Sequence, residues 1–416
     1  MNADTIAAPP DRLSRRIYLF TSVFSAVLYT VLLVAPVIAF PLTTKYQLEP
    51  TQVGLLFSCE LGAFSLATVP AYLWLSRVPL VRSVTVCTII VILGNLVSGF
   101  VPSFEALLLV RIITSLAAGS ITVVLLALGP KASNPGRAFG LFVVCQLAMG
   151  ALILAVFPSL YANADVSAMY WTLAGLSVIC LFFIPLVRGI DLAEAGAAKP
   201  GRLTSGRSTL AKEKIPAFVA GLAAIVFFYI ALSGVWSFMG QLSTAAGNSE
   251  NATSIVLMIA TIAGIASALL ATILGDSPRR RGYLLSGFAV LALSVLVLLG
   301  GPALLRFAIA AILFKFGWTF VLPYLISSVS ALGGGPQTMN TVNLMIGGGF
   351  ALGPIIAGAL IAGPSGFTGM IVFSFAALLA ATAGAALLTR RTRGEAAAPP
   401  ITGSLAAAEA ADKERN

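Results

Sequence analysis

Long apolar runs separated by short polar turns dominate the chain from residue 17 to residue 388. A helix that crosses the hydrocarbon of a bilayer, about 30 Å thick, needs about 20 mostly apolar residues. Twelve runs meet this requirement, so the pattern predicts an all-α integral membrane protein with 12 transmembrane helices. The predicted spans are 17–41, 52–75, 83–101, 105–128, 138–160, 168–187, 215–240, 252–274, 283–300, 303–326, 342–363 and 367–388.

The composition supports a membrane location and removes several classes of function. Apolar residues make up 58% of the chain and charged residues 10%, against roughly 45–50% and about 25% in soluble domains. Soluble enzymes and nucleic-acid-binding domains are therefore excluded. The chain contains no histidine, and its four cysteines lie far apart within apolar runs. We expect no metal site, no cofactor and no enzymatic activity.

Basic residues predict the orientation of the spans. If the N-terminus is cytoplasmic, 21 of the 25 Lys and Arg residues lie in cytoplasmic segments. This skew follows the positive-inside rule, and a miscounted span would destroy it. We expect a multi-pass protein of the cell inner membrane, with both termini in the cytoplasm.

The polar segments divide the chain into two halves. Residues 188–214 are rich in Gly, Ala, Ser, Lys and Arg and predict a flexible cytoplasmic linker. Six spans precede this linker and six follow it, which predicts two pseudo-symmetric halves. The predicted organisation is a cytoplasmic N-terminal tail (1–16), an N-terminal half (17–187), the linker, a C-terminal half (215–388) and a disordered cytoplasmic tail (389–416).

Basic loops repeat in the two halves. The second span is followed by Ser76-Arg-Val-Pro-Leu-Val-Arg82, and the eighth by Gly275-Asp-Ser-Pro-Arg-Arg-Arg-Gly282. The fourth span carries Arg111, followed by the small residues Ser115, Ala117 and Gly119. Together with the six-plus-six architecture, these motifs resemble the major facilitator superfamily, whose loop signature is Gly-x-x-x-Asp-Arg-x-Gly-Arg-Arg. The resemblance covers residues 15–390, although Ser76 and Pro79 depart from the signature in the first copy.

Three ionisable residues lie deep within predicted spans: Glu60, Arg111 and Lys315. Such residues usually mark substrate or proton pathways. Burial favours the protonated form of Glu60 and a nearby cation favours its carboxylate, so Glu60 could load and release a proton. A static salt bridge with Arg111 is the other interpretation. Lys315 lies too deep to reach water and needs a partner, either Glu60 or an anionic substrate.

Aromatic and polar residues add candidates for substrate binding. Lys315 lies within Phe314-Lys-Phe-Gly-Trp-Thr-Phe320, which combines a cation with aromatic faces and suits an aromatic carboxylate. The resemblance implies that helices 1, 4, 7 and 10 line the central cavity. The further candidates are Tyr29, Gln146, Trp236, Trp318 and Asn343. Trp236, near the end of its predicted span, could instead be an interface anchor.

The resemblance also implies two conformational elements. The basic loops form a cytoplasmic latch between the halves, carried here by Arg77, Asp276, Arg279 and Arg280. Gly353 and Pro354 form a hinge in the eleventh span, because small residues permit close packing and proline can kink a helix.

These features predict a secondary active transporter that works by alternating access. The chain has no GxxxxGK[ST] nucleotide motif, so proton coupling is the expected driving force. We expect symport of a small organic anion, with aromatic carboxylates among the candidates, by a monomer in the lipid bilayer, with Glu60 titrating and Lys315 meeting the carboxylate. The alternative is proton-coupled efflux of hydrophobic or drug-like compounds, in which Glu60 meets a cation.

Overall fold

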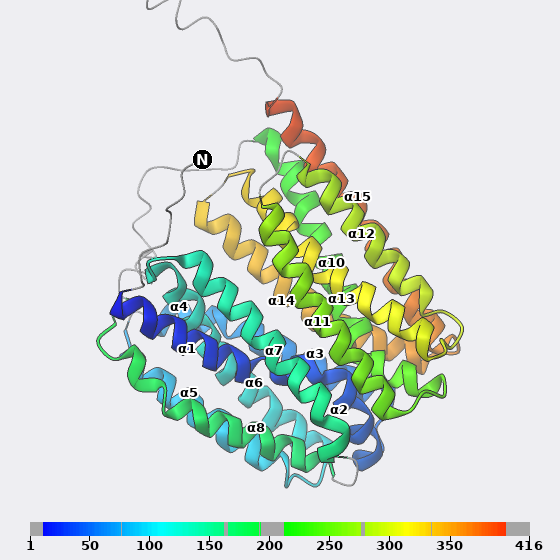
Figure 1. The fold of residues 1–416 in the computed structure, drawn as a ribbon, viewed down its shortest axis with the longest axis horizontal. Helices are drawn as coiled ribbons and strands as arrows, with labels where there is room; N and C mark the ends of the chain where they lie inside the picture. The colour runs from blue at the N-terminus through cyan, green and yellow to red at the C-terminus, as the bar shows by residue number, and fades with distance from the viewer. Residues whose placement is uncertain are drawn as a thin grey trace, which may run out of the picture.

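Helices build the whole of the described chain. The computed structural model describes residues 11–75, 77–161, 165–190, 192, 212–275, 279–333 and 335–396, and this part contains no strand. The first half consists of α1 (Arg12–Leu28), α2 (Thr30–Tyr46), α3 (Pro50–Leu66), α4 (Thr68–Trp74), α5 (Leu80–Ser98), α6 (Phe104–Leu128), α7 (Pro135–Tyr161) and α8 (Val166–Leu181). The second half consists of α10 (Ile215–Ala245), α11 (Glu250–Leu274), α12 (Arg280–Val297), α13 (Leu304–Ser330), α14 (Gly335–Ala362) and α15 (Gly366–Ala396). In Figure 1 the two halves lie side by side.

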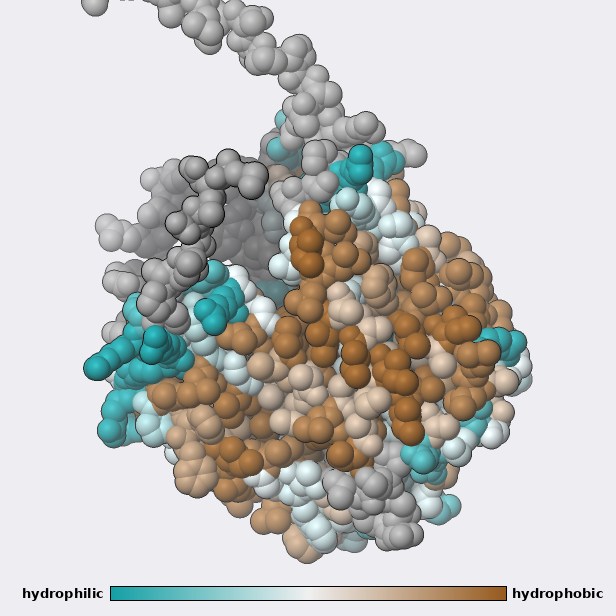
Figure 2. Space-filling view, viewed as in Figure 1, coloured by the Kyte–Doolittle hydropathy of each residue, from teal (hydrophilic) through white to brown (hydrophobic). Residues whose placement is uncertain are grey.

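These helices confirm the all-helical membrane fold. Eleven segments of the described chain are long and apolar enough to cross a membrane, counting α1 with α2 and α3 with α4. The shorter apolar helix α8, with 16 residues, takes the place of the sixth predicted span. Figure 2 shows apolar residues covering most of one face, with hydrophilic residues gathered toward its margins. The protein is therefore a multi-pass membrane protein.

Proline explains two differences from the predicted spans. The span predicted as 52–75 is divided at Ala67, because Pro70 has no N–H to donate and its ring crowds the carbonyl of Leu66. The span predicted as 168–187 ends at Leu181 and is followed by a 3-10 helix, Ile184–Val187, with Pro185 in its first turn. In both places the hydrophobic run continues while the α-helix does not.

The C-terminal end of the second half also differs from expectation. α15 continues to Ala396, so the prediction of a disordered tail from residue 389 is wrong as far as that residue. Within this helix the Thr389 hydroxyl donates to the Ala385 carbonyl one turn earlier. Residues 397–416 and most of the linker, 193–211, lie outside the described residues.

Most of the contact between the halves is made by three pairs of helices in the described chain: α2 with α10, α3 with α14, and α7 with α11. Glycine permits two of these contacts. A Cβ atom added to Gly54 would lie 2.4 Å from the Pro354 carbonyl oxygen, and one added to Gly240 would lie 1.9 Å from that of Pro36. The backbones of the two halves therefore touch without intervening side chains.

Each end of the bundle has its own contacts. At the end where α1 begins, here called the terminal end, Arg16 donates to the Leu186 carbonyl and Tyr18 to that of Asn134. At the opposite end, Lys45 lies 2.7 Å from Asp165. Asp165 is partly desolvated, but hydrogen bonds from Lys45 and Ser167 outweigh this and hold the pKa of its carboxyl below the usual value. Gln241 also donates to Thr43 across the halves at 3.0 Å.

The Gly240 contact generates a stability prediction. Gly240→Ala should lower the free energy of unfolding by about 1–3 kcal/mol, because its methyl group overlaps a backbone carbonyl that has no room to move. Gly140→Ala is the matched control, since an added Cβ there meets nothing within 4 Å. Thermal unfolding of the purified proteins measures both. Equal unfolding midpoints would show that the α2–α10 contact is not tightly packed.

Candidate functional site

The first half holds a buried ion-pair cluster made of Glu60, Arg111, Asn95 and Tyr170. The Arg111 guanidinium donates to the Glu60 carboxylate, and both residues are 2% exposed. A second guanidinium nitrogen donates to the Asn95 side-chain oxygen at 2.7 Å. The Tyr170 ring lies 5.0 Å from the guanidinium carbon. The cluster therefore satisfies a buried cation with a carboxylate, an amide and an aromatic face.

Four helices of one half bring these side chains together. α3 carries Glu60, α6 carries Arg111, α5 carries Asn95 and α8 carries Tyr170. Glycine allows α6 to approach α3, because a Cβ on Gly119 would lie 2.1 Å from the Phe64 carbonyl oxygen. The pairing of Glu60 with Arg111 was one of the predicted arrangements. Pairing of Glu60 with Lys315 is not observed.

The second half holds a different cation cluster, here called the tryptophan–lysine site: Lys315 and Trp318 on α13 and Trp236 on α10. Lys315 is 1% exposed, and its ammonium nitrogen lies 3.7 Å from the ring centroid of Trp236 and 4.1 Å from that of Trp318. The Lys315 stem lies against Gly264 of α11, where an added Cβ would be 3.1 Å from its Cγ. The predicted proximity of Lys315 and Trp318 is thus observed, and Trp236 joins them from another helix.

Two donors at this site have no acceptor in the described part of the chain. Trp236 is 3% exposed, and its indole nitrogen is buried without a hydrogen-bond partner. No described carboxylate, hydroxyl or carbonyl accepts a hydrogen bond from the Lys315 ammonium. Between residues 215 and 390 the sequence has only two carboxylates, Glu250 and Asp276, and both lie outside the helix interiors. Trp236 is therefore a buried partner of Lys315 and not an interface anchor.

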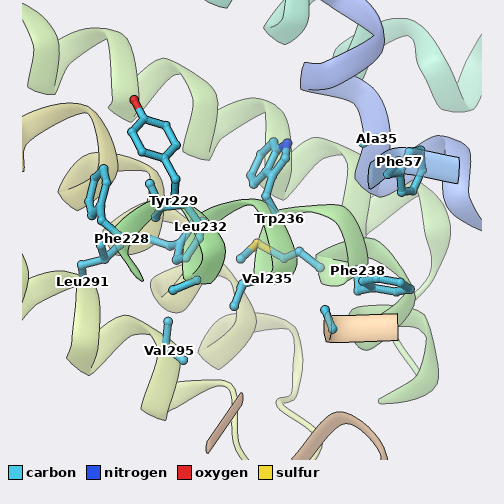
Figure 3. Close-up of a cluster of buried hydrophobic side chains, with 14 of the residues drawn as sticks. Ala35, Phe57, Phe228, Tyr229, Leu232, Val235, Trp236, Phe238, Leu291 and Val295 are labelled. Atoms are coloured by element: carbon cyan, nitrogen blue, oxygen red, sulfur yellow. The ribbon is translucent and has the colours of Figure 1, made fainter. Parts of the chain in front are cut away.

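Aromatic residues surround the tryptophan–lysine site. Phe350 of α14 lies 6.2 Å from Trp318 and 4.5 Å from Tyr229, measured between ring centroids. In Figure 3, Tyr229 and Trp236 extend from α10 to the same side, away from Val235. Tyr229 was not singled out from the sequence, although it lies two turns before Trp236 on the same helix.

Tyr29 and Gln146 lie on helices of the first half, whereas the tryptophan–lysine site is built from helices of the second. Tyr29, at the junction of α1 and α2, packs edge-on against Phe64 and Phe142, with ring centroids 5.0 and 5.3 Å away. Gln146 lies one turn from Phe142 on α7. A part for these two residues in substrate binding stays a prediction.

The predicted latch and the predicted hinge both stay predictions. Arg77 is exposed just after α4, Arg279 and Arg280 lie at the start of α12, and Asp276 lies outside the described residues. The latch therefore stays a prediction. At the hinge, an added Cβ on Gly353 would lie 2.5 Å from the Ile230 carbonyl oxygen. The next backbone N–H after Pro354, that of Ile355, donates to the Ser58 hydroxyl of α3 at 2.8 Å.

Asn95, Tyr170 and Ser58 are the site residues that the sequence analysis missed. Asn95 carried a signal, since it is an amide within an otherwise apolar run. Tyr170 and Ser58 carried none, because short hydroxyl residues and tyrosines recur along the spans. No group of three His, Cys, Asp or Glu residues in the described ranges could hold a metal ion.

Comparisons with known proteins agree with this architecture. The family model described as Major Facilitator Superfamily matches residues 17–336. A curated relative from Mannheimia succiniciproducens, a "Probable sugar efflux transporter", is 25% identical over 327 residues, which cover 76% of this chain and 78% of the relative.

Solved structures share the fold at lower identity. The nucleoside transporter NupG has a TM-score of 0.69 at 16% identity and covers 90% of this chain and 98% of its own. A D-xylose-proton symporter has a TM-score of 0.70 at 13% identity, with 88% and 96% covered. With the family model matching more than half of its residues, the chain belongs to the Major Facilitator Superfamily of membrane transporters.

Proposed function

We propose that the protein is a proton-coupled secondary transporter for a small organic anion, bound at the tryptophan–lysine site. The transporter would alternate between states that open this site to opposite sides of the membrane. The observation that carries the proposal is the pair of buried donors, Lys315 and Trp236, that have no acceptor in the described chain.

A carboxylate supplies what both donors lack. It brings the negative charge that no described residue of the second half places beside Lys315, and its two oxygens can accept from an ammonium and an indole N–H together. A buried cation without a counter-charge is costly, so an anion that neutralises it binds with a gain specific to this site. The neighbouring rings of Trp318, Phe350 and Tyr229 favour an aromatic or apolar body on the ligand.

Glu60 is the group that we propose to carry the proton. In the ion-pair cluster it is the only carboxylate, and its protonation would leave Arg111 with the Asn95 amide and the Tyr170 ring. α3, which carries Glu60, also packs along α14 of the other half. Protonation of Glu60 would therefore change the charge on a helix that must move when the halves rock against each other.

Export of hydrophobic or drug-like compounds is the second candidate. The relative from Mannheimia succiniciproducens is named as an efflux transporter, which favours this direction of transport. An apolar ligand would use the rings around the tryptophan–lysine site without its two donors. A cationic ligand is disfavoured there, because Lys315 has the same charge.

The cellular arrangement follows from the charge pattern. With 21 of the 25 basic residues on one side, we infer an inner-membrane protein whose terminal end faces the cytoplasm. We infer that the transporter acts as a monomer.

Replacing Lys315 tests the anion site. In proteoliposomes, Lys315→Met should reduce the uptake of labelled aromatic and aliphatic carboxylates about 30-fold or more, since truncating a buried charge partner costs about 2–5 kcal/mol. Lys45→Met is the control, because Lys45 belongs to the exposed pair at the opposite end. Normal carboxylate uptake by Lys315→Met would contradict the anion site. Export of lipophilic compounds that Lys315→Met leaves unchanged would support the second candidate instead, because such ligands do not need the Lys315 charge.

Replacing Trp236 tests the second donor. Trp236→Phe keeps an aromatic ring but removes the indole N–H, so the KM for the carboxylate should rise about tenfold or more, the value of one hydrogen bond to a charged group. Trp171→Phe, on exposed α8, is the control and should leave KM unchanged. An unchanged KM in Trp236→Phe would show that the indole N–H does not bind the carboxylate.

Replacing Glu60 tests the coupling. Glu60→Gln retains the shape but cannot titrate, so uphill uptake driven by a pH gradient should be abolished while exchange of labelled for unlabelled substrate continues. Glu105→Gln, at the exposed start of α6, is the control. A pH-sensitive dye inside the liposomes records the proton movement. Uphill uptake that persists in Glu60→Gln would show that Glu60 does not carry the proton and that the ion-pair cluster has a structural role.

A further inference from the structure

A groove, here called the seam groove, runs between α3–α4 of the first half and α14 of the second. Its volume is about 600 Å³. Its floor is the helix contact itself, where an added Cβ on Gly347 would lie 2.6 Å from Ser65 Cβ and one on Gly62 would lie 3.3 Å from Ala351 Cβ. None of the residues that line the groove belongs to either cation cluster.

The walls of the seam groove are continuous with the surface that faces the bilayer. Leu66 and Val69 on one wall are each 56% exposed, and Leu344 and Leu352 on the other are 55% and 48% exposed. We infer that these side chains contact lipid hydrocarbon, because they are exposed apolar groups on helices long enough to cross the bilayer. Between these walls Gly348 leaves space, since an added Cβ there meets nothing within 4 Å. The groove is therefore an indentation of the lipid-facing surface.

The length of the groove corresponds to one leaflet of the bilayer. Along α14 its lining extends from Thr341 to Leu352, a rise of about 16 Å. Half of the bilayer hydrocarbon is about 15 Å thick. Because α14 begins at the terminal end, the groove covers the leaflet on that side and ends near the midplane.

Polarity changes along the groove in the sense that a phospholipid requires. Its polar lining residues lie mainly toward the terminal end, where Thr68, Thr341 and Asn343 are found. Its deep end is lined by Gly62 and Ala351. A lipid that enters from the terminal-side leaflet would place its ester oxygens beside the hydroxyl and amide groups and its chain against the glycines.

We propose that the seam groove binds one acyl chain of a phospholipid from the leaflet on the terminal side. The chain lies along α14 with its ester end beside Thr341 and its methyl end near Ala351. Since the groove separates the two halves, a bound chain holds α4 and α14 apart at this end.

Photochemical labelling of the full chain tests this site. The protein is reconstituted in phosphatidylcholine vesicles that contain phosphatidylcholine with a diazirine near either the ester or the methyl end of one chain. After photolysis, labelled residues are identified by mass spectrometry of peptides. We expect the ester-proximal probe to label residues 68 and 341–343, and the methyl-proximal probe to label residues 62 and 351–352, both above the level on α8.

Matched glycine variants show whether labelling reports the groove. Gly348→Phe fills it and should reduce labelling of these residues at least fivefold. Gly175→Phe, on α8, is the control, because Gly175 is likewise an exposed helical glycine whose added Cβ meets nothing within 4 Å. Gly348→Leu replaces the Phe variant if the latter does not purify as a folded protein.

Three results would overturn the proposal. The first is labelling of the groove at or below the level on α8. The second is labelling that Gly348→Phe leaves unchanged. The third is labelling by the two probes in the reverse order along α14. None of these readouts depends on transport, so they are independent of the function proposed above.

Discussion

A charge inside the hydrocarbon of a bilayer needs opposite charge or aligned dipoles close to it, and the two halves of this protein meet the requirement differently. The first half is self-sufficient: Arg111 has Glu60, Asn95 and Tyr170 around it. The second half surrounds Lys315 with two indole rings and leaves it without a carboxylate. The first half thus neutralises its buried cation with its own side chains. The second half requires a counter-charge from outside the described chain.

The difference is visible at equivalent places in the two repeats. Glu60 is the eleventh residue of α3, and the eleventh residue of α11, its counterpart, is Ala260. One turn further along α11, Gly264 provides a surface for the stem of Lys315. Both halves therefore carry a buried cation, on α6 and on α13, but only α3 of the first half carries a buried acid beside it.

Hydropathy predicted the number and order of the spans well, because each helix must satisfy its backbone within the bilayer. It could not predict that α8 ends at Leu181 or that the second span divides into α3 and α4 at Ala67, since the apolar run continues past both points. Local proline chemistry, at Pro185 and Pro70, determines these ends.

For the site, the sequence identified the residue types and not their partners. Glu60, Arg111 and Lys315 were all recognisable as deep charges, but two cations were available to one carboxylate. The choice between them depends on the rotation of α3 relative to α6 and α13, which the hydrophobic pattern of nearly uniform helices does not specify. Asn95 and Trp236 take part for the same reason: packing turns them inward.

The hydrogen bond from Ile355 to Ser58 gives the seam between the halves a dependence on water. Pro354 removes one donor from α14, and the next N–H donates to a hydroxyl of the other half. If the halves separate along α3 and α14, this N–H and the Ser58 hydroxyl lose each other in a region where an unsatisfied group costs several kcal/mol. Water that enters the opening can replace both partners, whereas lipid chains cannot. Opening of this seam is therefore a wetting transition, and its rate would respond to osmotic pressure and to solutes that lower water activity.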